Sequence, residues 1–308
     1  MHPVRKFLLM GFCLSGGLPA FCQQADSTRP PQMMPPVSVA GETPETVYHH
    51  PRFFHYIAGV PSDIAHMSAV PFQKKALVPV SFIAGSTGLL LLFDQRITNL
   101  TGRTLHHWGI TQQEQMRDVV ELGKYDLFNY PANVNTFFYG LGKTAPTLML
   151  VGGFFAAGKI GHNDRALRTA YELTESYMNS LVTVQTLKRI TGRQSPNRAT
   201  IPGGKWHWFP SLSKYQRDIT NYIAFPSGHM ADLMSAVTVI AENYPEKKWI
   251  RPIGYSMIGL MGISMLNNKV HWASDFPLGL GIGYISGKIT HRRHQKEFEK
   301  SHATPILF

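Results

Sequence analysis

Long apolar segments, interrupted by glycines and short polar stretches, dominate the chain from residue 76 onward. Their apolar positions recur at helical spacing, most clearly at 164–192. Strand signals are weak, with no hairpin dipeptide between alternating runs and no regular exchange of strands and helices. The pattern therefore predicts an all-α bundle of six helices, at 76–94, 135–160, 164–192, 226–244, 249–266 and 271–289.

One of these segments approaches the length of a membrane span. A bilayer-crossing helix needs about 20 predominantly apolar residues, and 76–93 is apolar without a charge. The other segments are marginal, and the mean hydropathy of the chain is −0.11. Glycine-rich helices suit close packing in lipid. A compact membrane bundle and a soluble bundle of buried helices both stay open at this point.

The N-terminus has the pattern of a secretory signal peptide. Arg5 and Lys6 precede an apolar run, and Ala20 and Cys22 occupy positions typical of a cleavage site. The sequence therefore predicts a signal peptide at 1–22, with a first membrane helix as the alternative.

Three further regions follow. The proline-rich stretch 23–50 is expected to be an extended linker. We expect one helical domain at 51–292 and a basic polar tail at 293–308. Both cysteines, Cys13 and Cys22, lie in the predicted signal peptide, so the mature chain would have neither disulfides nor cysteine metal sites.

The chain is basic, with a formal net charge of +11, or +9 without Arg5 and Lys6. A basic balance points to nucleic acid, an anionic membrane surface or an anionic substrate. No dense run of lysine and arginine is present, and export argues against nucleic acid. The partners expected are therefore a membrane surface and a phosphorylated substrate.

The segment 226–229 reads Pro-Ser-Gly-His and opens an apolar helix. The free amides of a helix N-terminus form an anion site. Ser227 can add a hydroxyl, Gly228 lets an anion approach the backbone, and His229 can exchange a proton near neutral pH. The alternative is an ordinary capped helix with a surface histidine.

A second motif pairs His271 with Asp275. At this spacing both side chains would lie on one face of a helix. A carboxylate beside an imidazole fixes its tautomer and makes the other nitrogen a better nucleophile. The alternative is a structural pair, and the zinc-binding pattern of paired histidines on one helix is absent.

A third, basic motif ends the helix at 164–192. Its sequence, LKRITGRQSPNR, carries four cations into a loop, beginning with Lys188. Any one of them could simply complement the dipole at the C-terminus of the helix. The separation of eight residues between Lys188 and Pro196 is the feature that distinguishes the motif.

In this order and spacing, the three motifs resemble those of the type 2 phosphatidic acid phosphatase superfamily, which also includes class A acid phosphatases and vanadium haloperoxidases. The family pattern is Lys-x6-Arg-Pro, then Pro-Ser-Gly-His, then Ser-Arg-x5-His-x3-Asp. The resemblance covers 188–275, and the helical layout extends it to about 76–290. It implies a six-helix bundle of the acid phosphatase/vanadium haloperoxidase type.

The resemblance also implies roles for individual residues. His271 resembles the nucleophile that forms a phosphohistidine, Asp275 its orienting carboxylate, and His229 the general acid. No metal or cofactor is implied, since fixed cations and amides can hold the phosphoryl group. The residues that resemble phosphate ligands are Lys188, Ser227 and Gly228.

Two arginines of the family pattern are replaced, by Ser195 and Met265. Each charge-assisted bond contributes roughly 1.5–3 kcal/mol, so losing both corresponds to a factor of about 10² to 10⁴ in rate. Arg193, Arg198 and Lys269 lie close by in sequence. Arg193 and Arg198 are the preferred candidates to restore phosphate binding, and Lys269 is a weaker one.

The loop before the Pro-Ser-Gly-His motif contains an aromatic cluster at 206–209, beside Lys205. Aromatic residues next to lysine are typical of membrane interfaces. The loop is expected either to contact a membrane or lipid tail or to form a packed lid over the site.

These observations predict a phosphatase of the bacterial envelope that hydrolyses a lipid phosphate or diphosphate through a phosphohistidine, with its site facing the periplasm. One alternative is a catalytically weakened member that binds a phospholipid, for which the residues at 195 and 265 are the evidence. Another is a soluble, non-specific periplasmic acid phosphatase.

Overall fold

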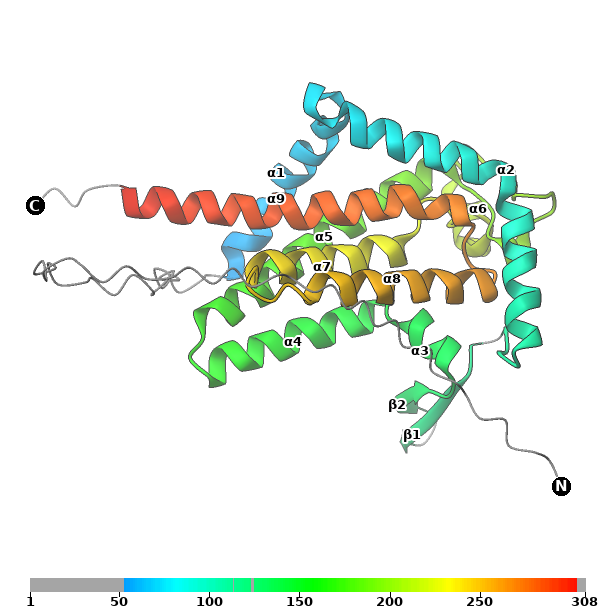
Figure 1. Ribbon diagram of the computed structural model, residues 1–308, viewed down its shortest axis with the longest axis horizontal. Helices are drawn as coiled ribbons and strands as arrows, with labels where there is room; N and C mark the ends of the chain where they lie inside the picture. Colours follow the sequence, from blue (N-terminus) through cyan, green and yellow to red (C-terminus); the bar gives the residue numbers. More distant parts are fainter. Residues whose placement is uncertain (1–52, 113, 123–124, 304–308) are drawn as a thin grey trace, which may run out of the picture. The chain divides into compact units, whose positions relative to one another are not determined.

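The computed structural model describes residues 53–112, 114–122 and 125–303 (Figure 1). The predicted signal peptide at 1–22 and linker at 23–50 lie outside the described residues. The α-helices are α1 (Phe53–Ala69), α2 (Leu77–His107), α3 (Val134–Gly140), α4 (Thr144–Ile160), α5 (Asp164–Thr191), α6 (Leu212–Arg217), α7 (Gly228–Asn243), α8 (Ile250–Asn267) and α9 (Phe276–Ala303). Short 3₁₀ turns are η1 (Val70–Phe72), η2 (Lys74–Ala76), η3 (Pro196–Arg198), η4 (Ile219–Asn221) and η5 (Ala273–Asp275).

The predicted all-α class is confirmed, although the count of six helices is not, because the described residues contain nine α-helices. The segment predicted as one helix at 135–160 is divided into α3 and α4. Between them, Gly142 packs directly against the Cβ of His229. Helix α9 runs on to Ala303, past the predicted boundary at 292.

The weak strand signal concealed one hairpin. Strands β1 (Met116–Leu122) and β2 (Tyr125–Pro131) pair antiparallel, with Met116 opposite Pro131 and Leu122 opposite Tyr125. The register shifts within β1, which breaks the strict alternation by which a strand is recognised in a sequence.

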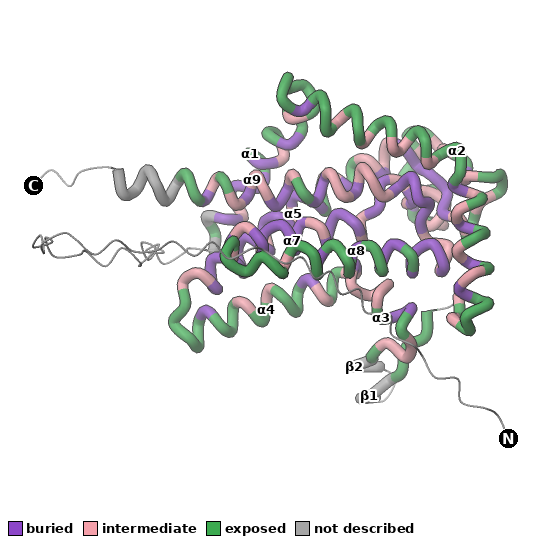
Figure 2. The backbone as a smooth tube through the Cα atoms, viewed as in Figure 1, coloured by how far each residue is buried: buried purple, intermediate pink, exposed green. Residues whose placement is uncertain are grey.

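The core lies between α5, α7, α8 and α9. Met230 and Val237 of α7 pack with Ile258, Met261 and Met265 of α8 in one buried cluster. Figure 2 shows the buried positions concentrated along α5, α7 and α9, with exposed positions along the outer face of α4.

Helices α7 and α9 run in the same direction at very close range. Gly279, Gly283 and Gly287 of α9 follow one another at four-residue spacing, and an added Cβ at each would collide with α7. Gly279 lies against Ser227 and Gly283 against Ala231. Both helices therefore begin at the same end of the bundle.

Helix α2 has two chemically different halves. It is the one described helix that is long and apolar enough to cross a membrane, and its apolar half at 77–93 exposes many large side chains, including Phe82 and Leu92. From Asp94 onward the sequence is polar. The first half runs beside α9, where Ile83 contacts Gly281, and the second half crosses the end of the bundle (Figure 1).

Candidate active site

All three sequence motifs meet at the end of the bundle that α2 crosses. The C-terminal turn of α5 carries Lys188, the N-terminal turn of α7 carries His229, and the segment between α8 and α9 carries His271. The shared direction of α7 and α9, imposed by the glycine contacts, is what brings the second and third motifs together.

The N-terminus of α7 has the arrangement of an anion site. Ser227 caps the helix, its Oγ accepting from the amide of Met230 at 3.4 Å. The Ser227 amide donates to the carbonyl of Asp275 at 3.0 Å. Among the described residues, the amides of Gly228 and His229 have no hydrogen-bond acceptor. These two amides are therefore available to an anion.

Lys188 places its ammonium over this helix N-terminus. Its Nζ lies 3.5 Å from the position that a Cβ on Gly228 would occupy, and the residue is buried. Burial lowers the pKa of Lys188 to about 8, against the opposing effects of Asp232 and Asp275. A cation and two free amides thus converge on one buried point.

His271 is held with one ring nitrogen inward. Its Nδ1 lies 2.7 Å from the carbonyl oxygen of Ala224 and 3.4 Å from Oδ2 of Asp275. Because both neighbours are acceptors, the proton belongs on Nδ1 and Nε2 keeps its lone pair. Burial lowers the pKa of His271 despite the opposing effect of Asp275, so the imidazole is held neutral as a nucleophile requires.

The expectation that His271 and Asp275 share a helix face is wrong. Asp275 ends the 3₁₀ turn η5, and α9 begins only at Phe276. The carboxylate of Asp275 accepts from the amide of Trp272 at 2.7 Å and closes this turn. The pair approaches through a capped turn instead of through successive turns of a helix.

His229 lies beside His271. The two rings are perpendicular with centroids 5.6 Å apart, and Tyr139 of α3 stacks on the other side of His229 at 5.2 Å. Burial lowers the pKa of His229 well below its usual range, and His271, Lys188 and Lys143 lower it further. An anion bound among these cations would oppose that shift and favour the protonated ring.

Arg193 lies behind the histidine and not on the phosphate side. Its guanidinium is fully buried and bonds Oδ1 of Asp275 at 2.5 Å and Oδ2 of Asp94 at 2.6 Å. It also donates to Ser274 Oγ at 2.7 Å. In this structure Arg193 fixes the carboxylate of Asp275, which orients His271. The hydrogen bonds of its guanidinium are made to Asp94, Gly203, Ser274 and Asp275, and none is made to α7.

The other preferred candidate cation, Arg198, also bonds a part of the chain other than α7. Arg198 is exposed and donates to Thr220 Oγ1 at 3.2 Å. Ser195 is buried, and Met265 is fully buried with its Sδ 3.8 Å from Ser227 Oγ. The space beside Ser227 is thus filled by a thioether where the family pattern has an arginine.

Several residues of the site were missed in the sequence. Asp94 gives its carboxylate to Arg193 and to the amide of Ser274, and its signal was a lone carboxylate directly after an apolar run. Asp232 follows His229 by one turn, is 9% exposed, and has its pKa raised to about 7 by burial. Tyr139 and Lys143 carried no signal that distinguishes them from other residues of a helix–loop boundary.

Within the described part of the chain, no group of three or more histidine, cysteine, aspartate or glutamate side chains is arranged to hold a metal ion. The polar side chains at the site are basic or hydroxyl-bearing apart from Asp232 and the Arg193-paired carboxylates. They suit an anion better than a cation.

The aromatic loop borders the site with its largest side chains outward. Trp206 and Trp208 stack at 5.7 Å, and Trp206 covers the guanidinium of Arg193 at 4.9 Å. Trp208 and Phe209 are 63% and 72% exposed. The inner part of the loop is packed against Arg193, and the outer part is apolar and exposed.

Comparison with known proteins bears on the same region. The model of the PAP2 superfamily matches residues 170–299. Lipid A 1-phosphatase of Porphyromonas gingivalis is 31% identical over 80 residues, which are 26% of this chain and 18% of that protein. The alignment therefore spans less than a fifth of the relative's length.

A transmembrane PAP2-type phosphatidylglycerolphosphate phosphatase from Bacillus subtilis aligns in structure with a TM-score of 0.44 and 15% identity, over 79% of this chain and 96% of that one. The family match covers α5 from residue 170, all of α7 and α8, and α9 up to residue 299, and it includes the three motifs. The likeness to the PAP2 superfamily is thus shown for the segment 170–299, which contains all three motifs.

Proposed function

We propose that the chain is a membrane-associated phosphatase of the bacterial envelope, which hydrolyses a lipid phosphate or diphosphate through a phosphohistidine at His271. One observation carries the proposal. The imidazole of His271, with Nδ1 bonded to Ala224, is close enough to the ammonium of Lys188 to interact with it electrostatically, and that ammonium lies over the free amide of Gly228. The arrangement supplies a nucleophile and a receptor for phosphate oxygens together.

In the first step, Nε2 of His271 attacks phosphorus and the bond from phosphorus to the lipid oxygen breaks. That oxygen takes a proton from His229, whose ring lies beside that of His271. Asp275 and the Ala224 carbonyl stabilise the positive charge that develops on the ring of His271.

In the second step, a water molecule attacks the phosphoryl group and the bond between nitrogen and phosphorus breaks. His229, now neutral, takes the proton of the attacking water. Inorganic phosphate leaves, and both histidines return to their starting states.

The position of the site along α2 supports a lipid substrate. The apolar half at 77–93 is about 25 Å long, close to the thickness of a hydrocarbon core. Asp94, which bonds Arg193 and Ser274 behind the site, is the first residue beyond it. Lipid headgroups lie at this depth, and the names of both related proteins specify phosphorylated lipids.

One observation favours the alternative of a lipid-binding protein with weakened catalysis. Met265 fills the space beside Ser227, and neither Arg193 nor Arg198 reaches the α7 N-terminus. Under this alternative the site would still hold a phosphorylated lipid but release phosphate slowly.

Phosphate release by purified protein from a panel of lipid monophosphates and diphosphates tests the proposal. We expect release from at least one of these lipids and much slower release from a soluble ester such as p-nitrophenyl phosphate. Binding of the lipids without release would favour the binding alternative, and preferred hydrolysis of the soluble ester would favour the non-specific acid phosphatase.

The charge of Lys188 predicts a pH dependence of anion binding. Sulfate is a dianion throughout the neutral and alkaline range, so its affinity reports the protein alone. Since Lys188 loses its proton with a pKa of about 8, sulfate affinity should fall above about pH 8, approaching tenfold per pH unit. The measurement is inhibition of phosphate release by sulfate between pH 7 and 10.

Lys188→Arg provides the matched control, because a guanidinium stays charged over this range. In this variant the affinity for sulfate should no longer decline between pH 8 and 10. A decline of equal size in both proteins would show that another group controls the anion site.

A further inference from the structure

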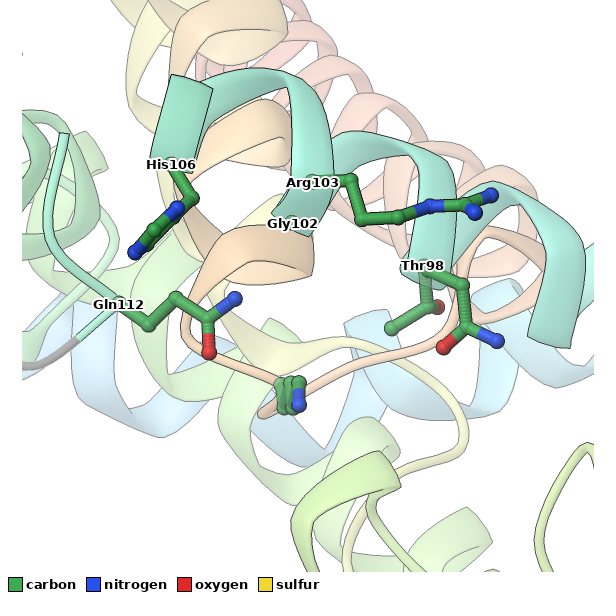
Figure 3. Close-up of a pocket in the computed structure, with 7 residues that line it drawn as sticks. Thr98, Gly102, Arg103, His106 and Gln112 are labelled. Atoms are coloured by element: carbon green, nitrogen blue, oxygen red, sulfur yellow. The ribbon is translucent and has the colours of Figure 1, made fainter. Parts of the chain in front are cut away.

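A pocket lies between the polar half of α2 and the turn at Lys269, which precedes His271. It has a volume of about 440 Å³ and is lined by the polar half of α2 together with Gln112 and Lys269. Figure 3 shows Thr98, Gly102 and Arg103 along one helix, with Gln112 facing them across the opening. Apart from Lys269, which the sequence offered as a weaker candidate for phosphate binding, none of the residues assigned above to nucleophile, acid or phosphate binding lines this pocket.

The lining consists of groups that donate hydrogen bonds to anions. Arg103, His106 and Lys269 are basic, and no acidic residue lines the pocket among the described residues. Within the described part of the chain, these three side chains form no ion pair or hydrogen bond. A cavity with three basic side chains and no carboxylate attracts an anion.

Two details indicate that the pocket is shaped for a ligand. Thr98 Oγ1 is buried and, among the described residues, has no hydrogen-bond partner. Lys269 adopts a left-handed backbone conformation, with φ of 55°, which is unfavourable for a residue with a Cβ. Its carbonyl accepts from the amide of Asn197 at 2.9 Å, which holds the turn in place.

The pocket is close to His271 along two paths. Lys269 precedes His271 by two residues, so their Cα atoms are at most about 7 Å apart. Thr98 lies one helical turn, about 6 Å, beyond Asp94, whose carboxylate bonds the Ser274 amide. Both paths place the pocket next to the turn that holds His271.

We propose that this pocket binds a second anionic group, of the phosphate monoester class, on the same lipid that presents its reacting phosphate to His271. This inference rests on the proposed function and narrows its substrate. It predicts selectivity for lipids whose headgroup carries two separate phosphates over lipids that carry one.

The test compares lipids whose headgroup bears one phosphate monoester or two, in phosphatidylcholine vesicles. In Arg103→Gln/Lys269→Gln, KM for the two-phosphate lipid should rise by about tenfold to a hundredfold. The value of kcat should stay unchanged, and KM for the one-phosphate lipid should change less than about twofold.

Arg96→Gln is the matched control, because Arg96 lies on the same helix, carries the same charge and does not line the pocket. An equal rise in KM for both lipids, or an equal effect of Arg96→Gln, would show that only the general positive charge of the protein matters and would overturn the inference.

Vesicle flotation of His271→Ala protein keeps the test independent of turnover. Preferential binding to two-phosphate vesicles, lost in Arg103→Gln/Lys269→Gln on the same background, supports the pocket even if the wild-type protein releases no phosphate. Equal binding to both vesicles overturns the inference while leaving the proposed function standing.

A free phosphate is the other source of this chemistry. If the pocket bound free anions, millimolar sulfate would alter hydrolysis of the one-phosphate lipid in the wild type but not in the double variant, beyond its competition at Lys188. That result would overturn the assignment of the pocket to the lipid headgroup.

Discussion

Replacement of His271 by alanine should lower phosphate release by about 10³-fold or more, on the scale seen when a catalytic nucleophile is removed. The reason is that Nε2 of His271 is the ring nitrogen that keeps a free lone pair, since Nδ1 bonds the Ala224 carbonyl. The measurement is the rate of phosphate release from the best lipid of the panel. Lipid binding should be retained, because Lys188 and the α7 amides are unchanged.

His66→Ala is the matched control, since His66 is an exposed histidine on α1. Both variants should keep their helical circular dichroism, and the control should keep full activity. Full activity in His271→Ala protein would contradict the assignment of the nucleophile.

Replacement of Arg193 by leucine should destabilise the protein by about 3–5 kcal/mol, because it leaves the buried carboxylates of Asp94 and Asp275 without their cation. For a chain of this size, the midpoint of thermal unfolding should fall on the order of 10 °C. Activity should also fall, since Asp275 would lose the bond that holds it beside His271.

Arg198→Leu is the matched control, because it removes the same charge five residues away, at an exposed side chain that donates one hydrogen bond to Thr220. Its unfolding midpoint should stay within about 2 °C of the wild type. Adding Asp94→Asn to Arg193→Leu should recover part of the loss, because one buried charge is removed. An unchanged midpoint in Arg193→Leu would show that the buried network contributes little to stability.

The sequence predicted the helical class, because apolar periodicity is a local pattern. Apolar periodicity marked α5, α7 and α8 to within a few residues. It did not show that the segment 135–160 breaks at Gly142, where contact with His229 from a distant part of the chain decides the structure. The hairpin was missed because a shift of register obscures its alternation.

The site shows the same division. His229, His271 and Lys188 could be selected by residue type and spacing, because their chemistry is visible in their side chains. The position of Arg193 could not be predicted from the sequence. Its closeness to Ser195 in the sequence suggested that it binds phosphate, whereas its ion pair with Asp94 of α2 holds the guanidinium behind His271. An ion pair across 99 residues leaves no local signal.

Under the proposed function, the network behind His271 would also link catalysis to the membrane. Asp94 ends the apolar half of α2 and bonds both Arg193 and Ser274. The depth of α2 in a bilayer would therefore fix the height of the nucleophile relative to the lipid headgroups.

The central claim is that the phosphoryl group passes through His271. Its most direct test is rapid quenching of the enzyme with a radiolabelled phospholipid under alkaline conditions, followed by identification of the labelled peptide. The account predicts an acid-labile, base-stable phosphoryl group on the peptide that contains His271, and no label in His271→Ala protein. Steady turnover without label, or label on a different residue, would contradict it.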